Sequence, residues 1–261
     1  MTYDSPVERI MLLTSVCSPA ATCASPCSPA YLATGMGGGI QLTRAEGIGI
    51  VVAVLLSASA GAVDIIAYLQ FDHVFVANMT GNTVLFASDV VALQFPKALS
   101  HLLPIFTFLL GVVTARIAVI RLDQPSWPKM GVCLVVISGL WTIAAVLIPN
   151  LGSILIPVLA FTMGAQNASL PRVEKIPVNT AFITGNLEKL GETIASLLQK
   201  RTGRDEQLKM WVVGSIWVAY ALGAAGGALA ALHFGRQSLL FPAGLLCLSA
   251  ILILVTHSRK S

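Results

Sequence analysis

Charged residues are scarce in this chain of 261 residues. Asp, Glu, Lys and Arg together make up 11% of the sequence, whereas 56% of the residues are hydrophobic. So few charges cannot supply the polar surface that a soluble globule of this length needs, but an exterior that faces lipid does not need one. The composition therefore excludes an ordinary soluble domain and predicts an integral membrane protein.

The motifs of catalysis and of nucleotide binding are also missing. The sequence contains no G-x-x-x-x-G-K-[ST], no H-E-x-x-H and no G-x-S-x-G. We therefore expect no enzyme, no catalytic residues and no cofactor. The net charge of +4 is explained by basic residues at a cytoplasmic membrane surface, so nucleic acid is not an expected partner.

Cysteines and histidines are too scattered to predict a metal site or a disulfide framework. Cys17, Cys23 and Cys27 have C-x5-C-x3-C spacing, which matches neither the C-x2-C pairs of zinc sites nor a redox C-x-x-C. Cys133 and Cys247 lie in apolar runs, where they are expected to pack as small apolar side chains. The four histidines lie near the ends of such runs and are expected at the membrane interface: His73, His101, His233 and His257.

Six apolar runs are long enough to cross a bilayer. About 30 Å of hydrocarbon needs roughly 20 helical residues, since each residue adds about 1.5 Å. The runs are Ile48 to Phe71, Leu102 to Ile120, Met130 to Ile148, Leu151 to Leu170, Trp211 to Leu232 and Ser238 to Thr256. All six must be helical, because lipid offers no partner to an unpaired backbone group. The expected fold class is an all-α polytopic membrane protein.

Two more polar stretches, Phe75 to Phe95 and Asn179 to Gln199, decide the number of crossings. If both cross there are eight spans, and if both enter and return there are six. With six spans and cytoplasmic termini, only Lys97 and Arg236 of the 16 basic residues lie outside. With eight spans, these also move outside: Arg116, Arg121, Lys129, Arg172 and Lys175. Because basic residues collect on the cytoplasmic side, the sequence favours six spans, cytoplasmic termini and the plasma (inner) membrane.

A motif recurs in these two stretches. Phe75-Val-Ala-Asn78-Met-Thr80-Gly81-Asn82 is matched by Thr180-Ala-Phe-Ile-Thr184-Gly185-Asn186, and Gly61-Ala-Val-Asp64 upstream is matched by Gly164-Ala-Gln166-Asn167. We therefore predict a single membrane domain over residues 47–261, with one repeat at 47–148 and another at 149–256. Three spans per repeat is an odd number, so the second repeat enters the membrane from the opposite side, as in many transporters.

The first Thr-Gly-Asn motif (Thr80, Gly81, Asn82) and the second (Thr184, Gly185, Asn186) each precede a predicted helix. The helices are expected at Thr83 to Leu93 and Leu187 to Gln199. Glycine allows a tight turn, and Thr and Asn cap helix starts, so each motif is typical of a broken or re-entrant segment. The two readings left open are a substrate or ion site at the helix amino termini, which suit an anion, and a purely architectural break.

Polar residues within the spans are the other candidates. A buried Asp costs roughly 2.5–3.5 kcal/mol at the centre of a span, so Asp64 suggests a function. It lies nearer the outer end of its run than the centre, so a proton or cation site and a hydrogen-bonded interfacial residue are both open. Gln166 and Asn167, at the corresponding place in the second repeat, either bind substrate or bond between helices.

Glycines interrupt the run from Trp211 to Leu232. Gly223, Gly226 and Gly227 lie among alanines. Small residues let helix backbones approach closely in membranes, so we expect a tight helix contact there.

In combination these motifs resemble the YoaK family of membrane proteins, filed as domain of unknown function 1275. The resemblance is carried, in this order, by Gly61-x-x-Asp64, Phe75-Val-Ala-x-Met-Thr-Gly-Asn82, Met163-Gly-Ala-Gln-Asn167 and Ile183-Thr-Gly-Asn186. It extends from about Gly47 to the carboxyl terminus. The resemblance implies a six-helix membrane protein, for which a permease role is suggested, and it brings no substrate, reaction or catalytic residue.

Residues 1–46 fall outside this resemblance. They are rich in Ser, Pro, Ala, Gly and Cys, which is typical either of a disordered extension or of a start codon assigned too early, with Met36 as the alternative start. Their apolar run is too short for a signal peptide.

Two classes of function remain. The first is a secondary transporter or permease for a small polar or anionic solute, with the lipid bilayer as its other partner. The second is a non-transporting membrane assembly or sensor protein in which the motifs are architectural. The residues predicted for a substrate or ion site are Asp64, Asn78, Thr80, Gly81, Asn82, Gln166, Asn167, Thr184, Gly185 and Asn186.

Overall fold

The computed structural model is built almost wholly of helices. It describes residues 44–121, 127–147, 152–169, 172–173, 176–177, 180, 183–199 and 204–258. The chain divides into two units, Met1–Gly39 and Ile40–Ser261, and the described residues belong to the second. The predicted amino-terminal extension thus lies outside the described residues, apart from the first turn of α1.

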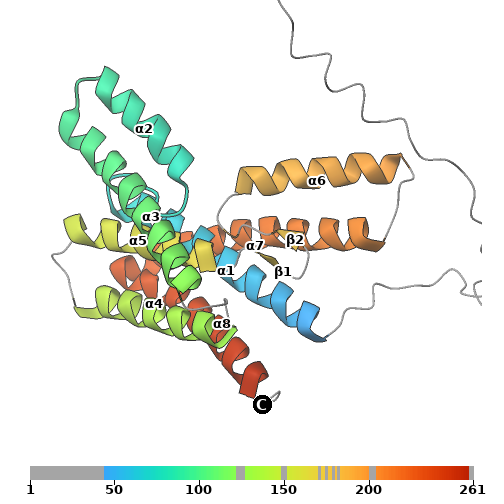
Figure 1. The fold of residues 1–261 in the computed structure, drawn as a ribbon. Coiled ribbons are helices and arrows are strands. Elements are labelled where there is room, and N and C mark those ends of the chain that lie inside the picture. The colour runs from blue at the N-terminus through green and yellow to red at the C-terminus, as the bar shows by residue number, and fades with distance from the viewer. Residues whose placement is uncertain are drawn as a thin grey trace, which may run out of the picture. The chain divides into compact units, whose positions relative to one another are not determined.

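The elements follow one another as shown in Figure 1. The α-helices are α1 (Arg44–Gln70), α2 (Met79–Val91), α3 (Phe95–Arg121), α4 (Trp127–Leu147), α5 (Gly152–Ser169), α6 (Ile183–Leu198), α7 (Arg204–Phe234) and α8 (Leu240–Ser258). A 3-10 helix, η2 (Gly235–Leu239), joins α7 to α8. The short strands β1 (Arg172–Val173) and β2 (Ile176–Pro177) form an antiparallel pair that the sequence does not predict.

Each of the six apolar runs is helical over nearly all of its described residues, as predicted. They correspond to α1, α3, α4, α5, α7 and α8. By length and composition, three stretches can cross a membrane: Gly47–Gln70, Phe95–Ala118 and Glu206–Thr256, the last of which comprises α7, η2 and α8. Shorter apolar helical segments occur at Gly131–Ile143 and Ile154–Ala168.

The two ambiguous stretches contain α2 and α6. These helices begin earlier than the sequence analysis places them, at Met79 rather than Thr83 and at Ile183 rather than Leu187. In α2 the reason is that Asn78 is the capping residue, so the first Thr-Gly-Asn motif forms the first turn of the helix instead of preceding it. The prediction of a turn ahead of the helix is therefore wrong in its detail.

The core is centred on α1, which packs along α7 and against α8. Three side chains tie α1 to these helices: the Ser57 hydroxyl donates to the Ile216 carbonyl at 2.9 Å, Gln70 Nε2 donates to the Ala231 carbonyl at 3.3 Å and the Ser59 hydroxyl donates to the Pro242 carbonyl at 3.2 Å. Residue numbers rise together along both helices in the contacts of α1 with α7, so the two helices run in the same direction.

A second pair of helices, α3 and α5, packs in the same way. In each pair the helices touch through glycine. A Cβ at Gly61 of α1 would overlap the backbone of Tyr220 in α7, and a Cβ at Gly164 of α5 would overlap the backbone of Phe108 in α3. Gly223 meets Ala58 of α1, which confirms the close contact predicted for the glycines of α7.

The helices α4 and α8 pack together, and α4 also contacts α5. The Ser138 hydroxyl donates to the Ala243 carbonyl of α8 at 2.8 Å, and the buried Trp141 indole donates to the Thr162 hydroxyl of α5 at 2.9 Å. Helix α3 exposes large apolar side chains on the face that points away from α5, among them Phe106 and Leu110. Such a face suits contact with lipid.

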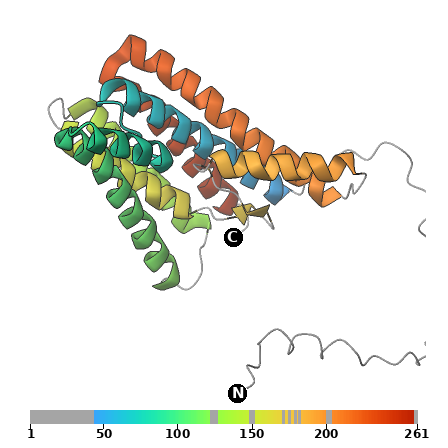
Figure 2. The ribbon, with the colours of Figure 1, turned by 90° about the horizontal axis from the view of Figure 1, so that it is seen from above.

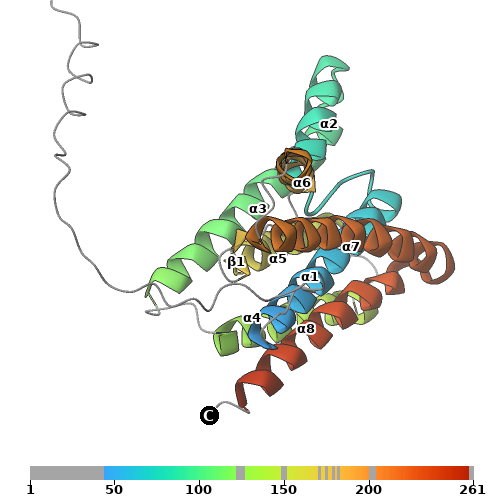
Figure 3. The same cartoon turned by 90° about the vertical axis from the view of Figure 1, so that its right-hand side faces the viewer.

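The short helices α2 and α6 lie apart from this core. Helix α2 folds back on α3 as a hairpin, and α6 lies along α7. Their amino-terminal ends approach one another in Figures 1 and 2, and in Figure 3, where α6 is seen end-on, the lower end of α2 lies beside α6. The two Thr-Gly-Asn motifs, which occupy the first turns of these helices, are therefore brought to the same region of the fold.

Candidate functional site

The carboxylate of Asp64 holds the segment between α1 and α2. Its Oδ1 accepts backbone N–H groups from Val76 at 2.8 Å, Ala77 at 2.6 Å and Asn78 at 3.4 Å. Its Oδ2 accepts the Tyr220 hydroxyl of α7 at 2.7 Å. Asp64 is only 2% exposed, so this set of donors supplies the hydrogen bonds that water would give a carboxylate at the surface.

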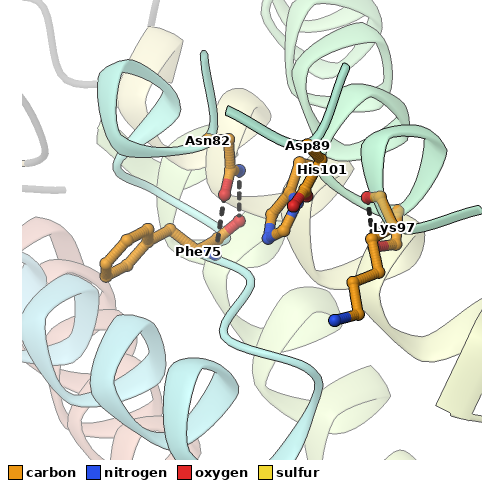
Figure 4. Close-up of polar contacts among 6 residues, drawn as sticks. Phe75, Asn82, Asp89, Lys97 and His101 are labelled. Carbon is orange, nitrogen blue, oxygen red and sulfur yellow. Dashed lines mark hydrogen bonds and ion pairs between the residues drawn. The ribbon is translucent and has the colours of Figure 1, made fainter. Parts of the chain in front are cut away.

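Asn82 binds the same segment from the other side. Its Oδ1 accepts the Phe75 backbone N–H at 2.9 Å, and its Nδ2 donates to the Phe75 carbonyl at 2.7 Å (Figure 4). The side-chain amide thus matches both backbone groups of a single residue. Asn82 is fully buried, so these two bonds fix where α2 begins relative to the segment before it.

Asn78 and Gly81 complete the first turn of α2. Asn78 Oδ1 accepts the Gly81 N–H at 3.2 Å, as expected of a helix cap. A Cβ at Gly81 would come within 2.8 Å of the Phe75 ring, so the turn needs a residue without a side chain. Thr80, by contrast, is exposed.

The candidates of the second repeat lie on α5 and α6. Gln166 Nε2 donates to the Leu56 carbonyl of α1 at 3.3 Å, so this side chain does bond between helices. Gln166 Oε1 and Asn167 Oδ1 are buried without a hydrogen-bond partner. In the second motif Asn186 is 1% exposed, whereas Thr184 is exposed, which is the pattern of Asn82 and Thr80 in the first.

The structure therefore brings the sequence candidates into two groups. Asp64, Asn78, Gly81 and Asn82 form one connected set with the segment before α2. Gln166 contacts α1 about two helical turns before Asp64, and the second motif approaches the first through the facing ends of α2 and α6.

A cavity of about 480 Å³ opens where α1 ends and the segment before α2 begins. Its walls include Phe71 at the end of α1, Ser100 in α3, Pro157 in α5 and Arg236 in η2. The Arg236 guanidinium lies 5.7 Å from the centre of the Phe71 ring. The end of α1 and the start of α3 thus line one cavity, although α2 lies between them in the sequence.

Two residues with buried polar contacts, Tyr220 and His101, were not predicted from the sequence. Tyr220 lies in a uniformly apolar run, and nothing in the spacing of residues links it to Asp64. His101, expected at the membrane interface, is instead 5% exposed, and its Nδ1 lies 2.8 Å from Asp89 Oδ2. His101 directly precedes the apolar run that begins at Leu102, and an ionisable residue so close to a span is the signal that could have drawn attention to it.

The comparisons with known proteins agree with these motifs. The family described as "Protein of unknown function (DUF1275)" matches residues 52–252. The chain belongs to the DUF1275 family. The UPF0700 transmembrane protein YoaK of Bacillus subtilis (strain 168) is 29% identical over 184 residues, which cover 64% of this chain and 81% of that protein. No solved structure matches.

The DUF1275 match covers α1 from Val52, both Thr-Gly-Asn motifs and most of α8. With the transmembrane relative and the long apolar helices, it identifies this chain as a membrane protein. The resemblance to the YoaK family inferred from the motifs is thereby confirmed. The family description assigns no activity, so function has to be argued from the arrangement of residues.

Proposed function

We propose that this DUF1275 protein is a secondary transporter or permease for a small polar or anionic solute. It crosses the plasma (inner) membrane six times, with both termini in the cytoplasm, and consists of two repeats of opposite orientation. The observation that carries the proposal is the approach of α2 and α6, whose amino termini face one another. Helix amino termini carry partial positive charge and free N–H groups, which suit an anionic or polar solute.

Helix lengths support six spans rather than eight. Helix α2 has 13 residues and α6 has 16. At about 1.5 Å per residue these helices reach roughly 20–24 Å, less than the roughly 30 Å of a bilayer core. The cavity beside Phe71 supports the same conclusion, since the end of α1 and the start of α3 lie together only if α2 returns to the side from which it entered.

Equivalent contacts support the repeat. Gly61 touches Tyr220 and Ala224 of α7, and Gly164, its partner in the repeated sequence, touches Phe108 and Val112 of α3. The converse contacts agree as well, because Gly223 meets Ala58 of α1 and Gly111 meets Phe161 of α5. Helix α1 therefore packs on α7 as α5 packs on α3, which is the relationship expected of two copies of one unit.

Transport by the purified chain tests the proposal. The full chain is reconstituted in vesicles and offered labelled amino acids, carboxylates, inorganic phosphate and nucleosides. We expect uptake of at least one solute, with loss of uptake in Gly81→Leu, because the new side chain meets the Phe75 ring. Gly139→Leu is the matched control, since a Cβ there meets nothing within 4 Å. No uptake of any solute by correctly folded wild-type protein would contradict the proposal.

A non-transporting assembly or sensor protein is the second candidate. It is favoured by the bonds of Asp64 and Asn82, which are directed to the chain's own backbone and to Tyr220. On this account, replacing Asn82 or Asn186 lowers the yield of folded protein and changes no flux. Variants that fold normally but transport differently would exclude it.

A further inference from the structure

The pair formed by Asp89 and His101 is a second polar feature of the α2–α3 hairpin. His101 Nδ1 lies 2.8 Å from Asp89 Oδ2, a distance at which a ring with its proton on Nδ1 donates a hydrogen bond to the carboxylate. The His101 side chain is 6% exposed and that of Asp89 is 17% exposed. The pair is thus almost enclosed, with its carboxylate end the more open.

The other ring nitrogen, His101 Nε2, is buried and has no hydrogen-bond partner. Buried polar atoms in folded proteins nearly always have partners, and an exception calls for an explanation. With the proton on Nδ1, Nε2 presents a lone pair that only a donor or a proton can satisfy.

The surroundings of the ring contain few other charges. Among the helices packed on α3, α2 contributes Asp89 and α5 has no Asp, Glu, Lys, Arg or His. On α3 itself, Lys97 lies one turn earlier and is exposed. In the segment before α2, Asp72 and His73 are both exposed.

We propose that Asp89 and His101 form a proton-binding site, and that a proton taken up at His101 Nε2 is the coupling ion of the transporter proposed above. The Nε2 lone pair accepts one proton and the ring becomes an imidazolium, still bonded through Nδ1–H to the Asp89 carboxylate. The net charge of the pair changes from −1 to 0.

The site is connected to the first Thr-Gly-Asn motif through α2. Asn82 and Asp89 are seven residues apart, so they lie on one face of that helix. Asn82 fixes the start of α2 to Phe75, and Asp89 fixes its end to α3 (Figure 4). A change of charge at Asp89 and His101 therefore acts on the helix whose amino terminus faces α6.

Imidazole nitrogen NMR of the reconstituted full chain tests the site without any solute. In the neutral ring of His101 we expect the proton on Nδ1 and a bare Nε2, and on acidification we expect Nε2 to take up a proton. Asp89→Asn should abolish the preference for Nδ1–H. His101→Gln identifies the signal by its loss, and His233→Gln, at an exposed histidine, is the control that leaves the signal in place. A ring that carries its proton on Nε2 throughout, or whose Nε2 never takes up a proton, would overturn the proposal.

A pH-sensitive dye trapped in the vesicles tests the coupling. Proton movement should accompany uptake of any transported solute and should be lost in His101→Gln, with uptake retained in His233→Gln. Uptake without proton movement in wild-type protein would refute proton coupling. Failure of the permease proposal itself is distinguishable, because a protein that moves no solute still gives the NMR result.

Discussion

The Tyr220 hydroxyl donates a hydrogen bond to Asp64 Oδ2 at 2.7 Å, joining residues 156 positions apart in the sequence. Through Asp64 Oδ1 the same carboxylate holds the backbone ahead of α2. One side chain therefore ties together the packing of α1 on α7 and the position of the first Thr-Gly-Asn motif. Asp64 therefore links the packing of these two helices to the position of that motif.

Replacing Asp64 should lower the stability of the folded protein more than replacing its partner. Hydrogen bonds to charged groups contribute about 1.5–3 kcal/mol. Asp64→Ala leaves several buried donors unpaired, so it should lower the free energy of unfolding by more than about 3 kcal/mol. Tyr220→Phe removes one bond and should lower it by about 1–2 kcal/mol. Thermal unfolding of both variants and of the double variant measures the coupling. If both single variants lose the same small free energy of unfolding, and the two losses add in the double variant, then the hydrogen bond between Tyr220 and Asp64 contributes little.

Replacing the glycines at the helix–helix contacts by alanine should push the two helices of each pair apart. Gly61→Ala and Gly164→Ala each place a Cβ against a backbone carbonyl, so each should destabilise the protein by about 1–3 kcal/mol, the usual range for overpacking. Gly139→Ala and Gly244→Ala are the matched controls, because a Cβ there meets nothing within 4 Å. Both controls should be neutral or stabilising by up to about 1 kcal/mol. If all four variants have the same unfolding temperature, the close contacts are not formed.

Both the oxygen and the nitrogen of the Asn82 side-chain amide should be needed for full stability of the fold. Asn82→Ala loses two hydrogen bonds to Phe75, a loss of about 1–3 kcal/mol. Asn82→Asp retains an acceptor for the Phe75 N–H but cannot donate to the Phe75 carbonyl, and it adds a buried charge, so it should be no better tolerated. Stability measured in detergent checks both variants. A fully stable Asn82→Asp would refute the two-bond arrangement.

The sequence predicts the six long helices well because helix length in lipid is set by the run of apolar residues. It also predicts the close packing of Gly223 from the cluster of small residues around it. The start of α2 is misplaced because both Asn78 and the following motif contain capping residues, and only the structure shows that Asn78 Oδ1 accepts the Gly81 N–H.

The sequence does not reveal which side chains from distant parts of the chain contact one another in the fold. Tyr220 and Asp64 lie on helices that meet only in the folded protein, so no spacing rule relates them. The burial of His101 likewise depends on α2 folding back on α3. Asp64 stands out in the sequence as an ionisable residue in a span, but its hydrogen-bond partners, which decide between a bound ion and a structural anchor, are set by the fold.

We propose that the two repeats of three spans have opposite orientations in the membrane, and thiol labelling tests this orientation most directly. Gln124→Cys, between α3 and α4, and Gln237→Cys, between α7 and α8, are made in a chain whose own cysteines are replaced, and intact cells are treated with a membrane-impermeant thiol reagent. Three crossings between the two positions predict that only Gln237→Cys is labelled, and that Gln124→Cys is labelled after the membrane is opened. Labelling of both positions from the same side would mean that α6 also crosses, and would contradict the account.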